Sequence, residues 1–320
     1  MIRIESLSKE YGDIKAVKNI SLVIKQGEIT GFLGPNGAGK SSTLKIIAGY
    51  NKASSGRVYI NEQNIEIEPE NTKKLIGYLP ELNPLYSEMT VFEYLKFVCE
   101  VRGIKGSEFN AKLKEIAGKC GIKERLNQQI STLSKGFKQR VGLAQAIIHD
   151  PPILILDEPT NGLDPNQIIE IRSLIRELGK NKTIILSSHI LQEVQAICDR
   201  IIIIHQGSIA ADAPKEELLK SVQKRQTISL EFTLVDITED DLITHFPFIT
   251  VKRFEKMEKS IVVVCETTST KDIRFELSKY LNSLKATILG LKYEEKTLEE
   301  VFHNVTIGKL LNGEIEGIKQ

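Results

Sequence analysis

The stretch "EITGFLGPNGAGKSSTLKIIAG", residues 28 to 49, predicts a buried strand, a glycine-rich loop and a helix that ends at Gly49. Its middle fits the pattern G-x-x-x-x-G-K-[ST] in the strand–loop–helix context that this pattern requires. Glycines let successive backbone N–H groups point into one concavity, and the start of the following helix adds positive charge. The plain alternative is a glycine-rich turn before a helix. We favour a phosphate-binding loop with these contact residues: Gly34, Pro35, Asn36, Gly37, Ala38, Gly39, Lys40, Ser41 and Ser42.

Two side chains of this loop carry most of its chemistry. Lys40 brings a movable positive charge to the β- and γ-phosphates, which makes it a catalytic candidate, and the Ser41 hydroxyl suits Mg²⁺. Hydrogen bonds to charged groups contribute about 1.5–3 kcal/mol each. Several of them account for micromolar nucleotide affinity, which corresponds to about 8 kcal/mol.

A second motif, "ILILDEPT" at residues 153 to 160, ends a buried strand with two acids. Because adjacent strand residues point to opposite sides, Asp157 and Glu158 are expected to have different roles. Asp157 is placed to hold Mg²⁺ through water, and Glu158 to orient and deprotonate an attacking water. A solvated strand end is the alternative, but an acid after four apolar residues needs a partner.

Two further residues are candidates on weaker grounds. His189 in "SSHIL" follows the next strand at the same edge of the sheet, where it would touch a γ-phosphate. A single histidine at a helix start also occurs without a functional role. Tyr11 in "KEYGDIKAV" either stacks on adenine or packs against its own hairpin, and the spacing leaves both interpretations open.

The pattern around these motifs predicts the architecture. Apolar and polar residues alternate through the first sixty positions, which predicts antiparallel strands. Short apolar runs separated by helices predict a parallel sheet buried on both faces; the runs are "ILILD" at 153–157, "TIILSS" at 183–188 and "IIIIH" at 201–205.

Between these two regions, residues about 90 to 150 follow a helical pattern. "TVFE" is a capping box, with Thr90 at the N-cap and Glu93 reaching back. A further helix begins at Ser134 and stops before Pro151.

A small C-terminal α/β domain is predicted over residues 227 to 307, after a first domain over residues 1 to 220. Its last helix is expected over 298 to 305, and the glycine-containing tail 308 to 320 is expected to be disordered. The C-terminal domain has no catalytic cluster, so we expect it to extend a dimer contact or to regulate.

The bulk composition limits the class of protein. A length of 320 residues suggests about two domains, and a net charge of +1 gives no attraction to nucleic acid or to an anionic membrane. The four cysteines contain no Cys-x-x-Cys pair, which predicts reduced core thiols. No apolar run approaches the ~20 residues of a membrane span, and the start lacks the apolar core of a secretion signal. We therefore expect a cytoplasmic protein without a membrane span or a nucleic-acid partner.

Residues 1 to about 220 resemble the ATP-binding subunit of ABC transporters. Besides the two motifs above, "LSKGFKQRVGLAQAIIHDP" (133–151) is similar to the family's signature motif, and "GLDP" (162–165) to its D-loop. "SSHIL" matches the switch histidine and Tyr11 the aromatic loop. The resemblance implies an α/β fold: a P-loop NTPase (RecA-like) core with an antiparallel β subdomain and a helical insert.

The resemblance also implies a homodimer that binds ATP and Mg²⁺ between its subunits. Each ATP is closed over by the partner's signature helix, which assigns nucleotide contacts to Ser134, Gly136 and the D-loop residue Asp164. Ser134 is placed at a helix N-cap, and Gly136 lets backbone N–H groups approach a phosphate. Hydrolysis then opens the dimer and moves an integral-membrane permease.

The chain departs from the family pattern at three positions. Lys135 and Phe137 stand where the family commonly has Gly and Gln, which puts a side-chain contact at the second position in doubt. In "GYLPELNPLY", Glu81 replaces the glutamine that links Mg²⁺ to the membrane subunit. A carboxylate ligates Mg²⁺ directly, so we expect Glu81 to make ATP binding more strictly dependent on Mg²⁺.

"YLPE" and the ending "TLEEVFHNVT" resemble ABC-2 type exporters, and two strings look closest to the ATP-binding subunit associated with gliding motility. We expect the chain to sit on the inner face of the membrane and to dock on a permease through residues 82 to 90. One alternative is a soluble ABC ATPase acting on ribosomes or DNA, but the second ATPase half or long coiled coil of such proteins is missing. The other, a regulatory module that never hydrolyses, conflicts with the presence of Glu158.

Overall fold

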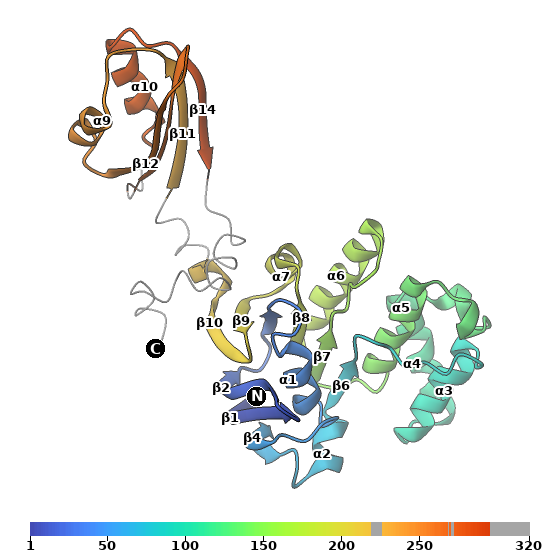
Figure 1. The fold of residues 1–320 in the computed structure, drawn as a ribbon. Helices are drawn as coiled ribbons and strands as arrows, with labels where there is room; N and C mark the ends of the chain where they lie inside the picture. Colours follow the sequence, from blue (N-terminus) through green and yellow to red (C-terminus); the bar gives the residue numbers. More distant parts are fainter. Residues whose placement is uncertain (219–225, 268, 270–271, 295–320) are drawn as a thin grey trace. The chain divides into compact units, whose positions relative to one another are not determined.

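The computed structural model describes residues 1–218, 226–267, 269 and 272–294, drawn in Figure 1. The described residues form two compact units, one up to Lys215 and one from Glu216 onward. The helix predicted over 298–305 and the tail predicted over 308–320 lie outside the described residues.

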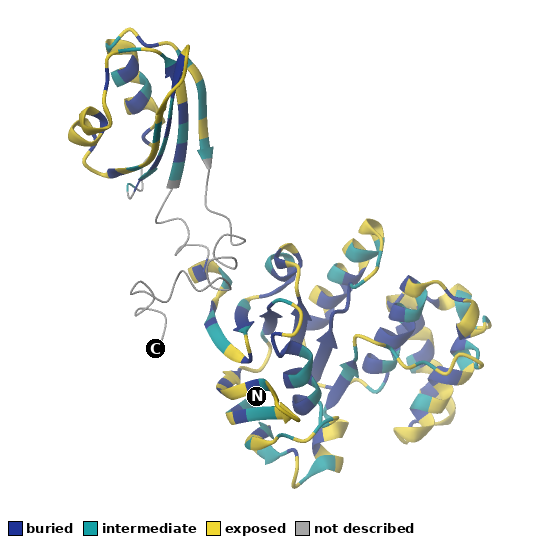
Figure 2. Cartoon of the chain, viewed as in Figure 1, coloured by how far each residue is buried: buried dark blue, intermediate teal, exposed yellow. Residues whose placement is uncertain are grey.

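A six-stranded sheet is the centre of the first unit, in the order β10-β9-β3-β8-β7-β6. Neighbouring strands are parallel except β10, which is antiparallel to β9. Every residue of β3, β7 and β8 is buried (Figure 2), so the predicted parallel sheet, buried on both faces, is confirmed. The strands are β3 (Ile29–Leu33), β6 (Ile76–Leu79), β7 (Ile153–Asp157), β8 (Thr183–Ser188), β9 (Arg200–His205) and β10 (Ser208–Pro214).

An antiparallel sheet, in the order β2-β1-β4-β5, covers part of this core. Its alternation buries one face: Ile4 of β1 lies in one apolar cluster with Leu44 of helix α1 and Ile155 of β7. The predicted antiparallel strands are therefore confirmed. The elements are β1 (Ile2–Tyr11), β2 (Ile14–Ile24), β4 (Ser55–Ile60), β5 (Gln63–Asn64) and α1 (Lys40–Ile47).

Helices dominate residues 90 to 150, as the pattern predicts. The capping box is present in full, since the Thr90 hydroxyl accepts from the Glu93 N–H and the Glu93 carboxylate accepts from the Thr90 N–H. The elements of this region and the helix before it are α2 (Pro69–Lys74), α3 (Val91–Val101), α4 (Gly106–Lys119), η1 (Lys123–Arg125), η2 (Ile130–Thr132) and α5 (Lys135–Ile147).

Helices α6 (Pro165–Gly179) and α7 (Leu191–Ile197) follow strands β7 and β8. Helix α7 packs closely on β3 at Gly31, where a Cβ would clash with the side chains of Val194 and Cys198. In the described part of the chain, no helix has the length and apolar character needed to cross a bilayer.

The second unit has its own core beneath one antiparallel sheet, in the order β12-β13-β11-β14. Its β-α-β-β-α-β succession is the split βαβ arrangement. The apolar periodicity of the sequence does not reveal α9 or β12, because charged residues interrupt it in both. The elements are β11 (Gln226–Thr233), α9 (Glu239–His245), β12 (Ile249–Lys256), β13 (Ser260–Thr267), α10 (Arg274–Ser283) and β14 (Ile288–Glu294).

All four cysteines are buried and unpaired, as predicted for core thiols. Burial raises the pKa of the Cys120 thiol to about 12 and that of Cys265 to about 11. These thiols are therefore protonated at neutral pH and act as apolar packing groups.

Candidate active site

The phosphate loop joins β3 to α1, and its backbone depends on glycine at two positions. Gly39 is the N-cap of α1 with φ of 106°, and a Cβ there would clash with the Ala16 carbonyl oxygen of β2. A Cβ on Gly34 would clash with the Ile204 carbonyl oxygen of β9. The loop is therefore held between two strands, with the N–H groups of the first turn of α1 at its end.

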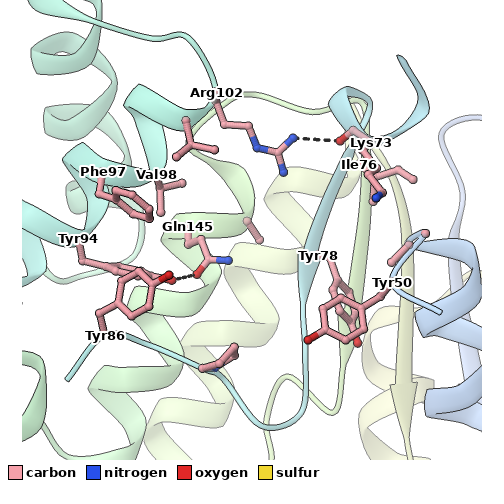
Figure 3. Close-up of a pocket in the computed structure, with 15 residues that line it drawn as sticks. Tyr50, Lys73, Ile76, Tyr78, Tyr86, Tyr94, Phe97, Val98, Arg102 and Gln145 are labelled. Atoms are coloured by element: carbon pink, nitrogen blue, oxygen red, sulfur yellow. Dashed lines mark hydrogen bonds between the residues drawn. The ribbon is translucent and has the colours of Figure 1, made fainter. Parts of the chain in front are cut away.

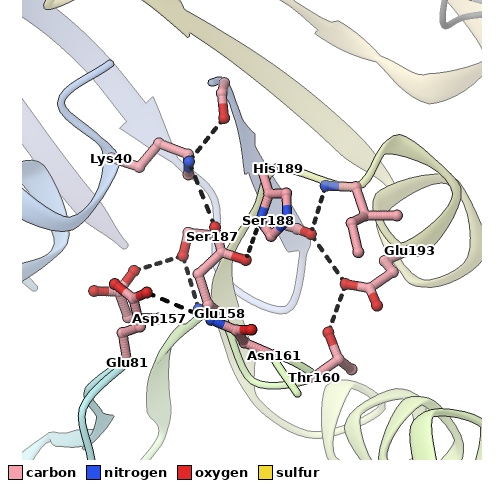
Figure 4. A network of polar contacts seen from close by, with 12 residues as sticks. Lys40, Glu81, Asp157, Glu158, Thr160, Asn161, Ser187, Ser188, His189 and Glu193 are labelled. Carbon is pink, nitrogen blue, oxygen red and sulfur yellow. Dashed lines mark hydrogen bonds and ion pairs between the residues drawn. The ribbon is translucent and has the colours of Figure 1, made fainter. Parts of the chain in front are cut away.

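Lys40 is buried at the start of α1 and reaches back over the loop. Its Nζ donates to the carbonyl oxygens of Gly34 at 2.7 Å and Pro35 at 3.3 Å. The same Nζ lies 3.4 Å from Glu158 Oε1 (Figure 4). The structure thus brings the predicted phosphate-binding cation and the predicted base together.

Asp157 is fully buried at the end of β7, and its Oδ1 accepts from Ser41 Oγ at 3.0 Å. Ser187 Oγ of β8 donates to the same Oδ1 at 2.6 Å. Oδ2 is buried without a hydrogen-bond partner among the described residues. A buried carboxylate oxygen beside a serine hydroxyl fits Mg²⁺, which takes oxygen ligands.

The protein supplies few ligands at this position. Among the described residues, no group of three or more His, Cys, Asp and Glu side chains is arranged to hold a metal ion. When Mg²⁺ is bound together with a nucleotide, it keeps waters and takes substrate phosphates, so one or two protein ligands suffice. Ser41 and Asp157 are the residues that would hold it.

Glu158 follows Asp157 but contacts different groups. Its backbone has φ of 49°, a left-handed conformation that is costly for a non-glycine residue and concentrates at functional sites. Its Oε2 lies 3.0 Å from Nδ1 of His189, and its side chain is almost fully buried. Glu158 therefore lies between the Lys40 ammonium group and the His189 ring.

His189 follows β8, and its side chain is 41% exposed. Glu81 follows β6 and is exposed; its Oε1 accepts from Asn161 Nδ2 at 3.4 Å. The carboxyl ends of parallel strands meet at one edge of a sheet. The segments that follow β3, β6, β7 and β8 therefore all begin at the same edge.

The remaining predicted residues are not joined to this cluster. Tyr11 ends β1, is 44% exposed, and its hydroxyl accepts from Asn51 Nδ2 at 3.0 Å. Lys9 Nζ lies over the Tyr11 ring, 4.9 Å from its centroid. Within the described ranges, no hydrogen bond or ion pair connects Tyr11 to the phosphate loop, so both interpretations of this tyrosine stay open.

Ser134, Gly136 and Asp164 form a second cluster, where the N-termini of α5 and α6 meet. Ser134 Oγ caps α5 by accepting from the Phe137 N–H at 3.4 Å, and Asp164 caps α6 by accepting from the Gln167 N–H at 2.9 Å. Gly136 packs so closely on the Gln167 side chain that a Cβ would clash with it. In the part of the chain described, no hydrogen bond or ion pair links this cluster to the phosphate loop.

Sequence reasoning missed the serine and acidic residues that support the site. Ser187 bridges Asp157 and the Glu158 N–H, which donates to its Oγ at 2.9 Å. Glu193 is buried and accepts from two hydroxyls in the same region. Ser187 lies two residues before the predicted histidine in "SSHIL", so proximity in sequence is the one signal that pointed to it.

A groove of about 450 Å³ separates the sheet from the helical region (Figure 3). Tyr86, from the segment predicted to dock on a permease, lies 5.5 Å from Phe97 and 5.9 Å from Tyr94 between ring centroids. Burial raises the pKa of Tyr94 to about 12, and its hydroxyl donates to Gln145. At another part of the groove, Arg102 donates to the Lys73 carbonyl oxygen at 3.0 Å. The groove is thus aromatic with two cationic residues in its lining.

Comparisons with known proteins agree with this geometry. A family model described as ABC transporter matches residues 17–161. The linearmycin resistance ATP-binding protein LnrL of Bacillus subtilis is 34% identical over 314 residues, which is 96% of this chain and 98% of that protein. The bacitracin transport ATP-binding protein BcrA of Bacillus licheniformis is 34% identical over 304 residues, 94% of this chain and 96% of that protein.

A solved structure of a similar protein shows a product state. It is a dimeric post-hydrolysis state of the ATP-binding cassette MJ0796 bound to ADP and Pi. Its TM-score to this chain is 0.63 at 27% identity, and the match covers 67% of this chain and 99% of that chain.

Proposed function

Because this chain belongs to the family of ABC transporter ATP-binding subunits and is an ATPase, we propose that two copies close around ATP and Mg²⁺ to drive a separate membrane permease. One observation carries the proposal: Lys40, Asp157, Glu158 and His189 converge from three separate segments at one edge of the sheet. Burial of the first three side chains makes their charges act in a low local dielectric.

In the proposed mechanism, Lys40 would contact the β- and γ-phosphates, and Ser41 and Asp157 would hold Mg²⁺. Mg²⁺ supplies charge neutralisation on the phosphates. Glu158 orients and deprotonates the attacking water, and His189, 3.0 Å from its carboxylate, contacts the γ-phosphate. Glu81, which follows β6 at the same edge of the sheet, would supply an additional carboxylate toward Mg²⁺.

The second cluster is proposed to act on the partner's nucleotide. Ser134 is the N-cap of α5, Gly136 lies in the first turn of α5 and Asp164 is the N-cap of α6, and helix N-termini favour anions. Support comes from the dimeric cassette MJ0796, whose described state contains two chains with ADP and Pi. In this proposal, each nucleotide is contacted by the phosphate loop of one copy and the second cluster of the other.

The groove is proposed to receive a short cytoplasmic segment of the permease. Five aromatic rings in its lining favour apolar side chains, and Lys73 and Arg102 favour an acidic one; the rings are Tyr50, Tyr78, Tyr86, Tyr94 and Phe97. The occupant would place the chain on the cytoplasmic face of the membrane. Replacing Tyr86 with Ala should release the protein from membranes, while Phe275→Ala, at a 75% exposed aromatic of the second unit, should not. Equal membrane retention of both variants would reject this docking site.

An exporter of the ABC-2 type is the proposed class of permease. The relatives LnrL and BcrA, matched over nearly their whole lengths, are named for linearmycin resistance and bacitracin transport. The gliding-motility relationship rests on two local stretches of sequence, and identifying the membrane protein that co-purifies with this chain decides it.

The test of the catalytic proposal is Glu158→Gln. The amide keeps the size of the side chain but removes the base, so ATP binding and dimerisation should persist while turnover slows at least ~10²-fold. ATP binding, the mass in solution and phosphate release are measured on the same preparation. Glu177→Gln, at an exposed position of α6, is the matched control and should change none of them. An unchanged turnover rate in Glu158→Gln would remove this residue from the mechanism.

A further inference from the structure

Glu193 is a charged side chain with only 3% exposure, located in the first turn of α7. Its Oε2 accepts hydrogen bonds from Thr160 Oγ1 at 2.5 Å and from Ser188 Oγ at 3.0 Å (Figure 4). Its Oε1 lies 3.8 Å from an amino group of Arg172. Burying a carboxylate is costly unless it is paired and hydrogen-bonded, and this one is both.

The two hydroxyls belong to the two segments that carry the proposed reacting groups. Thr160 lies two residues after Glu158, on the loop that leaves β7. Ser188 directly precedes His189, and its Oγ also accepts from the Ile190 N–H at 3.0 Å. Ser188 precedes His189 and bonds to two residues that follow it, Ile190 and Glu193, so these hydrogen bonds span the histidine.

The geometry has a consequence for the distance between the reacting groups. Glu158 and His189 come within 3.0 Å of each other, although their backbones leave different strands. Glu193 is bonded to both of these segments at once, whereas its distance of 3.8 Å from Arg172 is longer than a direct hydrogen bond. Arg172 balances the charge of Glu193, and the two hydroxyl partners tie its carboxylate to these two loops.

We propose that Glu193 is a positioning residue for ATP hydrolysis, which holds the loops of Glu158 and His189 in register through Thr160 and Ser188. The proposal rests on the roles proposed above for Glu158 and His189. In this proposal Glu193 acts through the two hydroxyls and not by contact with the nucleotide. Its removal lets the two loops move independently, and a displacement of about 1 Å at a reacting group costs up to ~10²-fold in rate.

The test compares three variants of the full-length chain. Glu193→Ala should lower kcat at least about tenfold while the Kd for ATP changes less than about threefold, because Lys40 and the phosphate loop are untouched. Glu193→Gln keeps an oxygen that accepts from both hydroxyls, so it should restore kcat to within about threefold of the unmodified chain. Gln195→Ala on the same helix is the matched control and should leave kcat unchanged.

A purely structural role predicts a different pattern. Both Glu193 variants would then lower the unfolding midpoint, while kcat per ATP-binding molecule would stay normal; that result overturns the proposal. The double variant Thr160→Val with Ser188→Ala removes the same two hydrogen bonds from the other side and should reproduce the loss of kcat. A double variant with normal kcat would also overturn it.

The outcome separates this inference from the catalytic proposal. If Glu158→Gln slows turnover and Glu193→Ala does not, only the positioning role is wrong. If Glu158→Gln leaves turnover unchanged, the assignment of the base is wrong, whatever the Glu193 variants do.

Discussion

Replacing Ser187 with alanine removes one hydroxyl that makes two buried hydrogen bonds where β7 and β8 end. The hydroxyl donates to Asp157 Oδ1 at 2.6 Å and accepts from the Glu158 N–H at 2.9 Å. Ser187 and Asp157 are fully buried and Glu158 nearly so, so water does not reach these groups without rearrangement. With alanine at this position, the Glu158 N–H has no acceptor. The Asp157 carboxylate loses one of the two hydroxyl groups that donate to it.

The size of the effect follows from these two losses. A hydrogen bond to a charged group contributes about 1.5–3 kcal/mol, and an unsatisfied buried donor costs about 1–3 kcal/mol. The carboxylate keeps its bond from Ser41, which places its loss at the lower end. We therefore expect the free energy of unfolding to fall by about 3 kcal/mol. For a unit of this size that corresponds to about 6–12 °C in the midpoint of thermal unfolding.

The assay is thermal unfolding of the full-length chain followed by circular dichroism at neutral pH, without nucleotide. Ser54→Ala is the matched control, because the Ser54 hydroxyl also accepts from a backbone N–H, that of Glu10 at 3.0 Å, but in an exposed place. It should shift the free energy of unfolding by no more than about 0.5 kcal/mol. If Ser187→Ala is as mild as Ser54→Ala, these buried hydrogen bonds do not stabilise the ends of the two strands.

Three more predictions concern the loop, a buried histidine and the metal site. Gly39→Ala should abolish binding of a fluorescent ATP analogue, because φ is 106° and a Cβ would clash with the Ala16 carbonyl oxygen; Gly37→Ala, with φ of 79° and open space, should cost only about 1–2 kcal/mol and retain binding. Burial lowers the pKa of His149 to about 4, so between about pH 6.5 and pH 4 the unfolded chain binds a proton that the folded chain does not. The free energy of unfolding should therefore fall by up to about 3 kcal/mol as the pH is lowered through this range, and urea unfolding of His149→Gln should lack this contribution. Glu81→Gln should make ATP binding less dependent on Mg²⁺, and titrations of ATP at several Mg²⁺ concentrations with no difference between the proteins would contradict the role of Glu81 as a ligand.

Local features of the molecule could be predicted from the sequence because short-range rules govern them. The phosphate loop needs a strand, glycines at set positions and a helix start, all of which lie within 28–49. The capping box at Thr90 depends on two residues three positions apart, and the structure has it as predicted. The buried parallel strands could also be predicted, because each one is a short apolar run that can be recognised within its own few residues. In α9 and β12 charged residues interrupt the apolar periodicity, and the capping box of Thr238 and Asp241 at the start of α9 is a local signal that the sequence reading missed.

Contacts between distant segments were decided by the tertiary structure alone. Parallel pairing of β7 with β8 sets Asp157 opposite Ser187, and only this register brings the serine to the carboxylate. Glu193 meets Thr160, 33 positions away in the chain, because α7 packs on the central sheet at β3. Periodicity reports which face of an element is buried, but it does not report which other element covers that face. The aromatic groove and the hydrogen bonds that Glu193 makes to the segments of Glu158 and His189 are properties of that packing, so only the tertiary structure shows them.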